Sequence, residues 1–124
     1  VIDKKKPKNL KTKFIKSDLS NIKNLKKITK NIDCIYHLAG VSDINKVKKM
    51  PTLTIKNNII LTVNLLEAAR INKIKRFVQI GSGGEYGNLK SPQRETSVSN
   101  PLSVYSKSKY KASKNLLKLL QMLL

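Results

Sequence analysis

Several residue types are scarce in this 124-residue chain, and each scarcity excludes a class of protein. A single cysteine, Cys34, excludes a disulfide framework, and neither Cys34 nor the single histidine, His37, has a partner at metal-ligand spacing. No apolar run approaches the ~18 residues of a membrane span, and no signal peptide is visible. We therefore expect a cytoplasmic protein with no bound metal and no membrane partner.

Acidic residues are also scarce, with seven Asp and Glu against 26 Lys and Arg and a net charge of +19. Such a balance is typical of nucleic-acid-binding proteins. However, 23 of these cations are Lys, they are scattered through every segment, and the chain has only four Tyr, two Phe and no Trp for base stacking. We expect a solvated surface and no nucleic-acid partner, and a basic nucleic-acid-binding module remains an alternative.

Short apolar segments alternate with amphipathic ones along the whole chain. Expected strands cover residues 1–3, 12–15, 33–38 and 76–80, and expected helices begin near Asn21, at Pro51 and at Ser103. Residues 41–50 read as a polar loop with room for one helical turn, and 81–102 as a loop. The last helix is expected to present Leu116, Leu117, Leu119 and Leu120 on its apolar face. This order predicts one α/β domain with a parallel sheet.

Three residues in the second half of the chain form a chemical pattern. Ser82 lies in a glycine-rich segment directly after the last expected strand, and 23 residues later Tyr105 and Lys109 stand four apart at the start of a helix. This spacing puts both side chains on one helix face. A lysine ammonium beside a phenol favours the phenolate, which helps a tyrosine exchange a proton near neutral pH.

This Ser…Tyr-x-x-x-Lys pattern resembles the short-chain dehydrogenase/reductase superfamily. The segments Glu85-Tyr86-Gly87 and Asn100-Pro101-Leu102-Ser103-Val104-Tyr105 are similar to its extended branch, the NAD-dependent epimerase/dehydratase family that acts on nucleotide sugars. The resemblance covers nearly the whole chain. It implies a Rossmann-like doubly wound parallel sheet, an NAD cofactor and a nucleotide-sugar substrate.

The resemblance also implies roles for these residues. Tyr105 would exchange the proton of the sugar C4 hydroxyl, Lys109 would bind the nicotinamide ribose and keep Tyr105 acidic, and Ser82 would hold the reacting oxygen. Substrate-binding residues would be Ser82, Gly83 and Glu85. A second match, Tyr110 with Lys114, lacks the Pro-x-Ser-x-Tyr context, so we expect Tyr110 to pack on the helix face.

Cofactor-binding positions follow from the same resemblance. Asp3 would accept hydrogen bonds from the adenine ribose and repel a 2′-phosphate, and Asp18 would bind the adenine amino group. Because Lys4 to Lys6 could accommodate a phosphate, NADP remains an alternative to NAD. The other implied contacts are Leu19, Leu38, Ala39, Gly40, Asn58, Tyr105 and Lys109.

Two positions depart from the family pattern. Leu61 replaces a glycine in the helix that carries Asn58, and we expect it to crowd the packing of that helix. Related 4,6-dehydratases place an acid two residues before the tyrosine of Tyr-Gly, and Gly84 occupies that position here. The residues therefore favour an epimerase or a 4-ketoreductase over a dehydratase.

The chain begins at Val1 without an initiator Met and stops within an expected helix. We interpret residues 1–124 as a partial NAD-binding Rossmann domain. The first strand, the glycine-rich pyrophosphate loop and the substrate-binding C-terminal part would be missing. Loss of a central strand predicts two half-sheets, and we expect the isolated chain to fold poorly and to be inactive. A dinucleotide-binding protein without catalysis remains an alternative, and the resemblance further implies a homodimer.

Overall fold

The computed structural model describes the backbone of residues 1–123 and the side chains in this range except those of residues 44, 115, 117 and 119–123. The elements, in chain order, are β1 (Ile2–Asp3), β2 (Ile15–Lys16), α1 (Ile22–Ile28), β3 (Cys34–His37), α2 (Ile44–Lys49), α3 (Pro51–Ile71), β4 (Arg76–Gln79), the 3-10 turn η1 (Gly83–Tyr86) and α4 (Val104–Leu123). The α/β order predicted from the sequence is confirmed. Most of the expected apolar face of α4, at 117, 119 and 120, lies outside the described side chains.

The strands of the described chain form two separate parallel pairs. β1 pairs with β2, with Ile2 opposite Ile15, and β3 pairs with β4, with Cys34 opposite Arg76 and His37 opposite Gln79. This arrangement matches the two half-sheets expected from the sequence. The central strand that we place between them in a longer protein stays a proposal.

Helix starts follow from local sequence chemistry. The Asn21 side chain accepts a hydrogen bond from the Asn24 amide at the start of α1, and Pro51 begins α3, where its missing N–H is not needed. Within residues 41–50, where the sequence predicts a polar loop with room for one helical turn, Ile44–Lys49 form the helix α2. The reason is Asp43, whose carboxylate accepts from the amides of Asn45 (2.9 Å) and Lys46 (3.1 Å) and so caps a helical turn.

The apolar core lies where the carboxyl-terminal half of α3 meets α1. Its buried members are Leu19, Leu25, Leu65 and Ala68, and the half-buried Ile2, Ile22, Ile28, Leu61 and Phe77 pack against them. Leu61, at the position where the resemblance expects glycine, is half-buried and packs against this core, and the crowding expected there stays a prediction.

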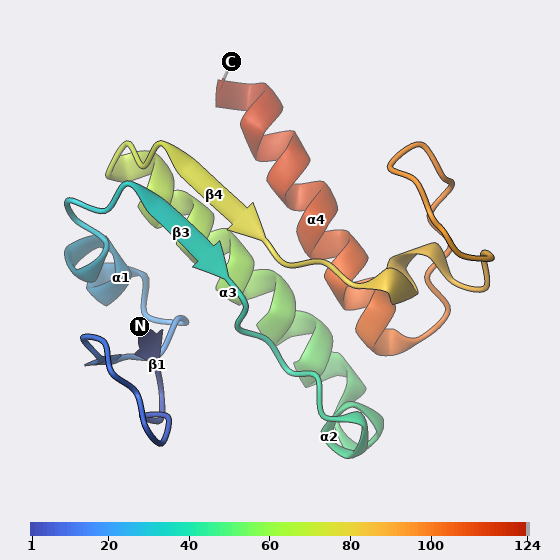
Figure 1. Ribbon diagram of the computed structural model, residues 1–124, viewed down its shortest axis with the longest axis horizontal. Helices are drawn as coiled ribbons and strands as arrows, with labels where there is room; N and C mark the ends of the chain where they lie inside the picture. The colour runs from blue at the N-terminus through green and yellow to red at the C-terminus, as the bar shows by residue number, and fades with distance from the viewer. Residues whose placement is uncertain (124) are drawn as a thin grey trace.

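The contact between α3 and α4 has a different character, because it buries polar side chains. Figure 1 shows α4 alongside α3, with β3 and β4 lying over α3. The buried polar residues of these elements are His37, Thr54, Asn58, Thr62, Ser106, Ser108 and Lys109. Buried polar groups need hydrogen-bond partners, so this contact is held in a defined geometry.

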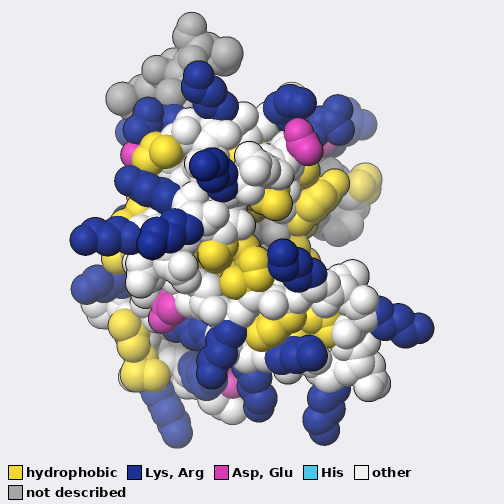
Figure 2. All heavy atoms as spheres, turned by 90° about the vertical axis from the view of Figure 1, so that its left-hand side faces the viewer, with side chains coloured by type: hydrophobic (Ala, Val, Ile, Leu, Met, Phe, Trp, Pro, Cys, Tyr) yellow, Lys and Arg dark blue, Asp and Glu magenta, His cyan; other side chains and the backbone are white. Residues whose placement is uncertain are grey.

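Basic side chains are spread over the outer surface, and parts of β3 and the residue after it are also exposed. Figure 2 shows Lys and Arg side chains spread over the visible face, with few acidic side chains between them. Leu38, at the end of β3, is 70% exposed, and Tyr36 within β3 is 68% exposed. Within the described range, none of the helices combines the length and apolar character that a bilayer span requires.

Candidate active site

Ser82 follows β4 and caps η1. Its hydroxyl accepts from the Gly84 amide at 3.3 Å, and its own amide donates to Glu85 Oε1 at 2.9 Å, which together form a capping box. The backbone around Ser82 is thereby fixed by Glu85, one of the residues that the sequence assigned to substrate binding. The carboxylate of Glu85 is directed into this turn and serves it structurally.

The turn η1 packs directly against the first turns of α4. The Ser113 hydroxyl lies 3.5 Å from Glu85 Oε1, so Glu85 links Ser82 to α4. A Cβ atom on Gly84 would lie 2.6 Å from Ser106 Oγ and 3.5 Å from Ser82 Oγ. Any side chain at 84 would displace Ser106, so the close contact between η1 and α4 explains why this position holds glycine. Gly83, by contrast, faces open space.

Tyr105 lies in the first turn of α4, on the wall of a cavity of about 560 Å³. The cavity is lined by Ser42, Val47, Lys48, Pro51, Ser103, Val104 and Tyr105. The start of this helix is set by Ser103, whose hydroxyl accepts from the Ser106 amide at 3.0 Å. A cavity of this volume is in the range of small-molecule sites.

Lys109 is one helical turn beyond Tyr105 and is buried, with 6% of its surface exposed. Burial lowers the pKa of Lys109, and the Glu85 carboxylate opposes that shift in part. Lys109 is thus buried on α4, where the charge of Glu85 from η1 acts on it. It brings Tyr105 and Lys109 onto one helix and packs the turn of Ser82 against it, whereas among the described side chains no hydrogen bond joins Ser82 to Tyr105 directly.

The two side chains of the second Tyr-x-x-x-Lys match, Tyr110 and Lys114, contact each other. The Lys114 ammonium lies 5.6 Å from the centre of the Tyr110 ring, within cation–π range. Tyr110 is half-buried on α4 and does not line the Tyr105 cavity. This pair therefore offers a control for the first match.

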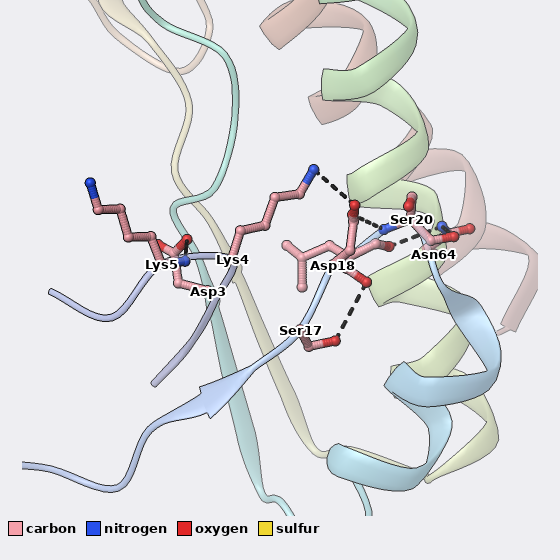
Figure 3. Close-up of polar contacts among 8 residues, drawn as sticks. Asp3, Lys4, Lys5, Ser17, Asp18, Ser20 and Asn64 are labelled. Atoms are coloured by element: carbon pink, nitrogen blue, oxygen red, sulfur yellow. Dashed lines mark hydrogen bonds and ion pairs between the residues drawn. The ribbon is translucent and has the colours of Figure 1, made fainter.

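The two acidic candidates sit at or just beyond the carboxyl ends of β1 and β2. Figure 3 shows Lys4 reaching the Asp18 carboxylate, whereas Asp3 and Lys5 are directed elsewhere. The Lys4–Asp18 distance is 2.8 Å, and the Ser20 amide donates to Asp18 at 2.9 Å. The hydrogen bonds from Lys4 and the Ser20 amide lower the pKa of Asp18 to about 2. Asp3 is exposed and accepts from the Lys5 amide at 3.3 Å.

The remaining cofactor candidates divide into exposed and buried residues. Leu38, Ala39 and Gly40 are exposed directly after β3, at the kind of strand end where ligands bind in open α/β sheets. A Cβ on Gly40 would lie 3.1 Å from Asn58 Oδ1, so glycine permits this close approach. Leu19 is buried in the apolar core, where it supports the Asp18 turn.

Asn58 and His37 take part in a buried polar network. The Asn58 carboxamide accepts from the Val41 amide at 2.7 Å and donates to the Val41 carbonyl at 3.3 Å and to Ser108 Oγ at 2.9 Å. The Thr62 hydroxyl donates to the Asn58 carbonyl at 2.9 Å and therefore accepts from His37 Nε2 at 3.0 Å. Burial, with a smaller contribution from Lys109, lowers the pKa of His37 to about 4.

Sequence reasoning assigned no role to Thr62 and Ser108 of this network, nor to the buried Ser106, which bonds Ser103 nearby. All three are hydroxyl residues inside helices, where they are not favoured by propensity. Their positions on the faces that α3 and α4 share were the available signal, because polar residues at core-facing helical positions need partners. Which partners they have depends on how the two helices pack.

Comparisons with known proteins agree with this geometry. The sequence model of the "NAD dependent epimerase/dehydratase family" matches residues 1–121. UDP-glucuronate 4-epimerase from Thermodesulfobacterium geofontis is 32% identical over 100 residues, covering 78% of this chain and 31% of the relative. GDP-mannose 4,6-dehydratase from Yersinia enterocolitica is 36% identical over 98 residues, covering 74% of this chain and 26% of the relative.

The fold gives the same result. A crystal structure of UDP-glucose 4-epimerase from Thermotoga maritima with UDP-glucose superposes with a TM-score of 0.87 at 26% identity, covering 97% of this chain and 42% of that one. The Rossmann-like fold predicted from the sequence is thereby confirmed. The chain spans less than half the length of these relatives. With a family match over 1–121, the chain belongs to the NAD dependent epimerase/dehydratase family.

Proposed function

We propose that the protein containing this chain is a nucleotide-sugar epimerase or 4-ketoreductase that uses Ser82, Tyr105 and Lys109 for hydride transfer at sugar C4. One observation carries the proposal. Tyr105 lines a cavity of about 560 Å³ at the start of α4, and Lys109 is held one turn further along the same helix. Membership of a family of epimerases and dehydratases supports the assignment.

The chain's own residues divide the proton chemistry among them. Tyr105 accepts the proton of the C4 hydroxyl when that carbon is oxidised and returns it when the ketone is reduced. Lys109, one turn further along α4, would bind the ribose hydroxyls of the nicotinamide half of the cofactor. Ser82 donates a hydrogen bond to the reacting oxygen and orients it. The capping box with Glu85 holds the Ser82 backbone in place for this role.

The residues at the strand ends fit NAD. Asp3 and Asp18 are hydrogen-bond acceptors suited to ribose hydroxyls and an adenine amino group, and Leu38 to Gly40 leave the end of β3 accessible. When bound, NAD supplies the hydride acceptor and donor. Asp18 would have to share or release Lys4 to bind adenine. The description of the matching family supports NAD, and NADP is the alternative because Lys4 to Lys6 directly follow Asp3.

The Gly84 contact favours epimerisation or reduction over dehydration. A dehydratase acid at this position would need a side chain where Ser106 Oγ now lies, 2.6 Å from the Cβ position. If the protein converted a nucleotide hexose to its 4-keto-6-deoxy product, this choice would be wrong. Analysis of products by mass spectrometry distinguishes the outcomes, because dehydration removes the mass of one water.

The test is a pair of tyrosine variants in the full-length protein. Tyr105→Phe should lower kcat roughly 100- to 10,000-fold with little change in NAD affinity, since it removes only the proton-transfer group. Tyr110→Phe, with the same deletion one turn away, should keep wild-type turnover. Wild-type turnover from Tyr105→Phe would refute the assignment. NAD binding without any turnover by the wild type would favour the alternative, a dinucleotide-binding protein without catalysis.

A further inference from the structure

Ser108 is the most completely enclosed hydroxyl in the polar contact between α3 and α4, with 0% of its surface exposed. It is neither a member of the Ser–Tyr–Lys set nor a residue of the Tyr105 cavity. Its hydroxyl donates to the Tyr105 carbonyl at 2.7 Å and accepts from Asn58 Nδ2 at 2.9 Å. Both bonds involve elements of the proposed site.

The Asn58 carboxamide extends this connection to the sheet. It bonds both the amide and the carbonyl of Val41, the residue directly after Gly40. Both hydrogens of the amide group are used, one toward Val41 and one toward Ser108. A single buried side chain therefore joins the segment after β3, on the cofactor side, to the turn of α4 that carries Tyr105 and Lys109.

We propose that Ser108 is a positioning residue, which with Asn58 clamps the Tyr105 turn of α4 to the Val41 segment and so sets Tyr105 and Lys109 relative to the cofactor. The proposal rests on the proposed function for its catalytic consequence. It follows from directionality: the Asn58 carboxamide bonds Ser108 on α4 and both backbone groups of Val41, which defines the position of the helix turn relative to that segment, whereas apolar packing would leave it adjustable.

The same molecule contains a matched arrangement outside the site. At the other end of α3, Asn72 Nδ2 donates to Thr29 Oγ1 at 2.8 Å, and Thr29 Oγ1 donates to the Leu25 carbonyl at 2.7 Å. Thr29 is buried to the same degree as Ser108. This Asn–hydroxyl–carbonyl relay joins α3 to α1 and touches no proposed catalytic residue. Its removal measures the structural cost alone.

The experiment compares Ser108→Ala with Thr29→Val in the full-length protein. Both variants remove one buried hydroxyl and two hydrogen bonds, so both should lower the melting temperature by a similar amount. Ser108→Ala should also lower kcat about 10- to 100-fold with little change in KM, because misplacement of the reacting groups acts on the transition state. Thr29→Val should leave both kinetic constants near wild type.

Two outcomes overturn the proposal: wild-type kcat in Ser108→Ala, or an equal loss of kcat in Thr29→Val. If Ser108→Ala does not fold, Ser108→Cys keeps the volume while weakening both bonds and should show the same selective loss of kcat.

A second measurement needs no turnover. The Val41 amide, bonded to Asn58, should exchange its hydrogen faster in Ser108→Ala than in Thr29→Val. Unchanged exchange would refute the clamp itself. Faster exchange in a protein whose wild type shows no hydride transfer would leave the clamp standing and count against the proposed function.

Discussion

The two halves of α3 pack in opposite ways. The carboxyl-terminal half places Leu65 and Ala68 in an apolar core against α1, whereas the amino-terminal half and the centre bury the polar residues Thr54, Asn58 and Thr62. Apolar burial is strong and non-directional, so it holds the fold together without fixing fine geometry. Hydrogen bonds between buried groups add little net stability but restrict orientation. The polar half is the one that lies beside Tyr105 and Lys109.

The largest loss of stability and activity is expected when residues 1–124 are studied alone. Two-stranded sheets are marginal by themselves, and Tyr36 and Leu38 remain exposed on β3 and just after it. We predict that neither half of α3 is held firmly in the isolated chain, which should show no cooperative thermal transition and no activity. A sharp melt by circular dichroism with slowly exchanging amides would show that the apolar half suffices.

The next largest effect is expected from truncating a buried side chain in the apolar half of α3. Leu65→Ala in the full-length protein should lower the free energy of unfolding by about 2–5 kcal/mol, because it removes buried methyl groups and leaves a cavity. Urea unfolding measures this change. Turnover per folded molecule should be unaltered, since Leu65 lies away from α4. A large loss of kcat without a loss of stability would contradict the division between the two halves.

His37 of β3 bonds Thr62 in the polar part of α3, and its titration should make the stability of the protein depend on pH. The pKa of His37 is lowered to about 4 from 6.5, so the unfolded chain binds the proton more readily than the folded chain. The contribution of His37 is therefore complete above pH 6.5 and is lost as the pH falls toward 4, by about 3 kcal/mol in all. Urea unfolding at pH 7 and pH 4.5 measures the slope.

His37→Gln provides the control for this slope, because an amide can still bond Thr62 but does not titrate. The variant should be less pH-dependent than the wild type over this range. Equal slopes in the two proteins would mean that His37 is protonated without cost and that its surroundings open on acidification.

The smallest effect is expected on the outer face of α3. Arg70 bonds Glu67 through two nitrogens at 2.7 and 2.8 Å, but both side chains are well exposed to solvent. Glu67→Gln should change the free energy of unfolding by less than about 1 kcal/mol, and added salt should reduce the difference further. A larger loss would show that exposed ion pairs, and not only buried polar contacts, hold this helix.

The sequence predicted much of this organisation and missed one part of it. Pro51, the Asn21 cap and the alternation of apolar segments were enough to place three helices and four strands, since these signals are local. The Asp43 cap was overlooked, so the segment of α2 was predicted only as a polar loop with room for one helical turn. The Tyr105–Lys109 spacing also predicted their shared position on α4, because a helix places residues four apart on one face.

The sequence alone determined the fold class, the family and the order of Ser82, Tyr105 and Lys109, since these depend on residue type and spacing along the chain. Only the tertiary structure decided which partners these side chains have. Asn58 bonds Val41 and Ser108, the Lys4 ammonium pairs with the Asp18 carboxylate, and Ser106 fills the space beside Gly84. Each of these contacts joins segments brought together by packing. Local sequence carries no record of such distances, which arise when α3, α4 and the strands assemble.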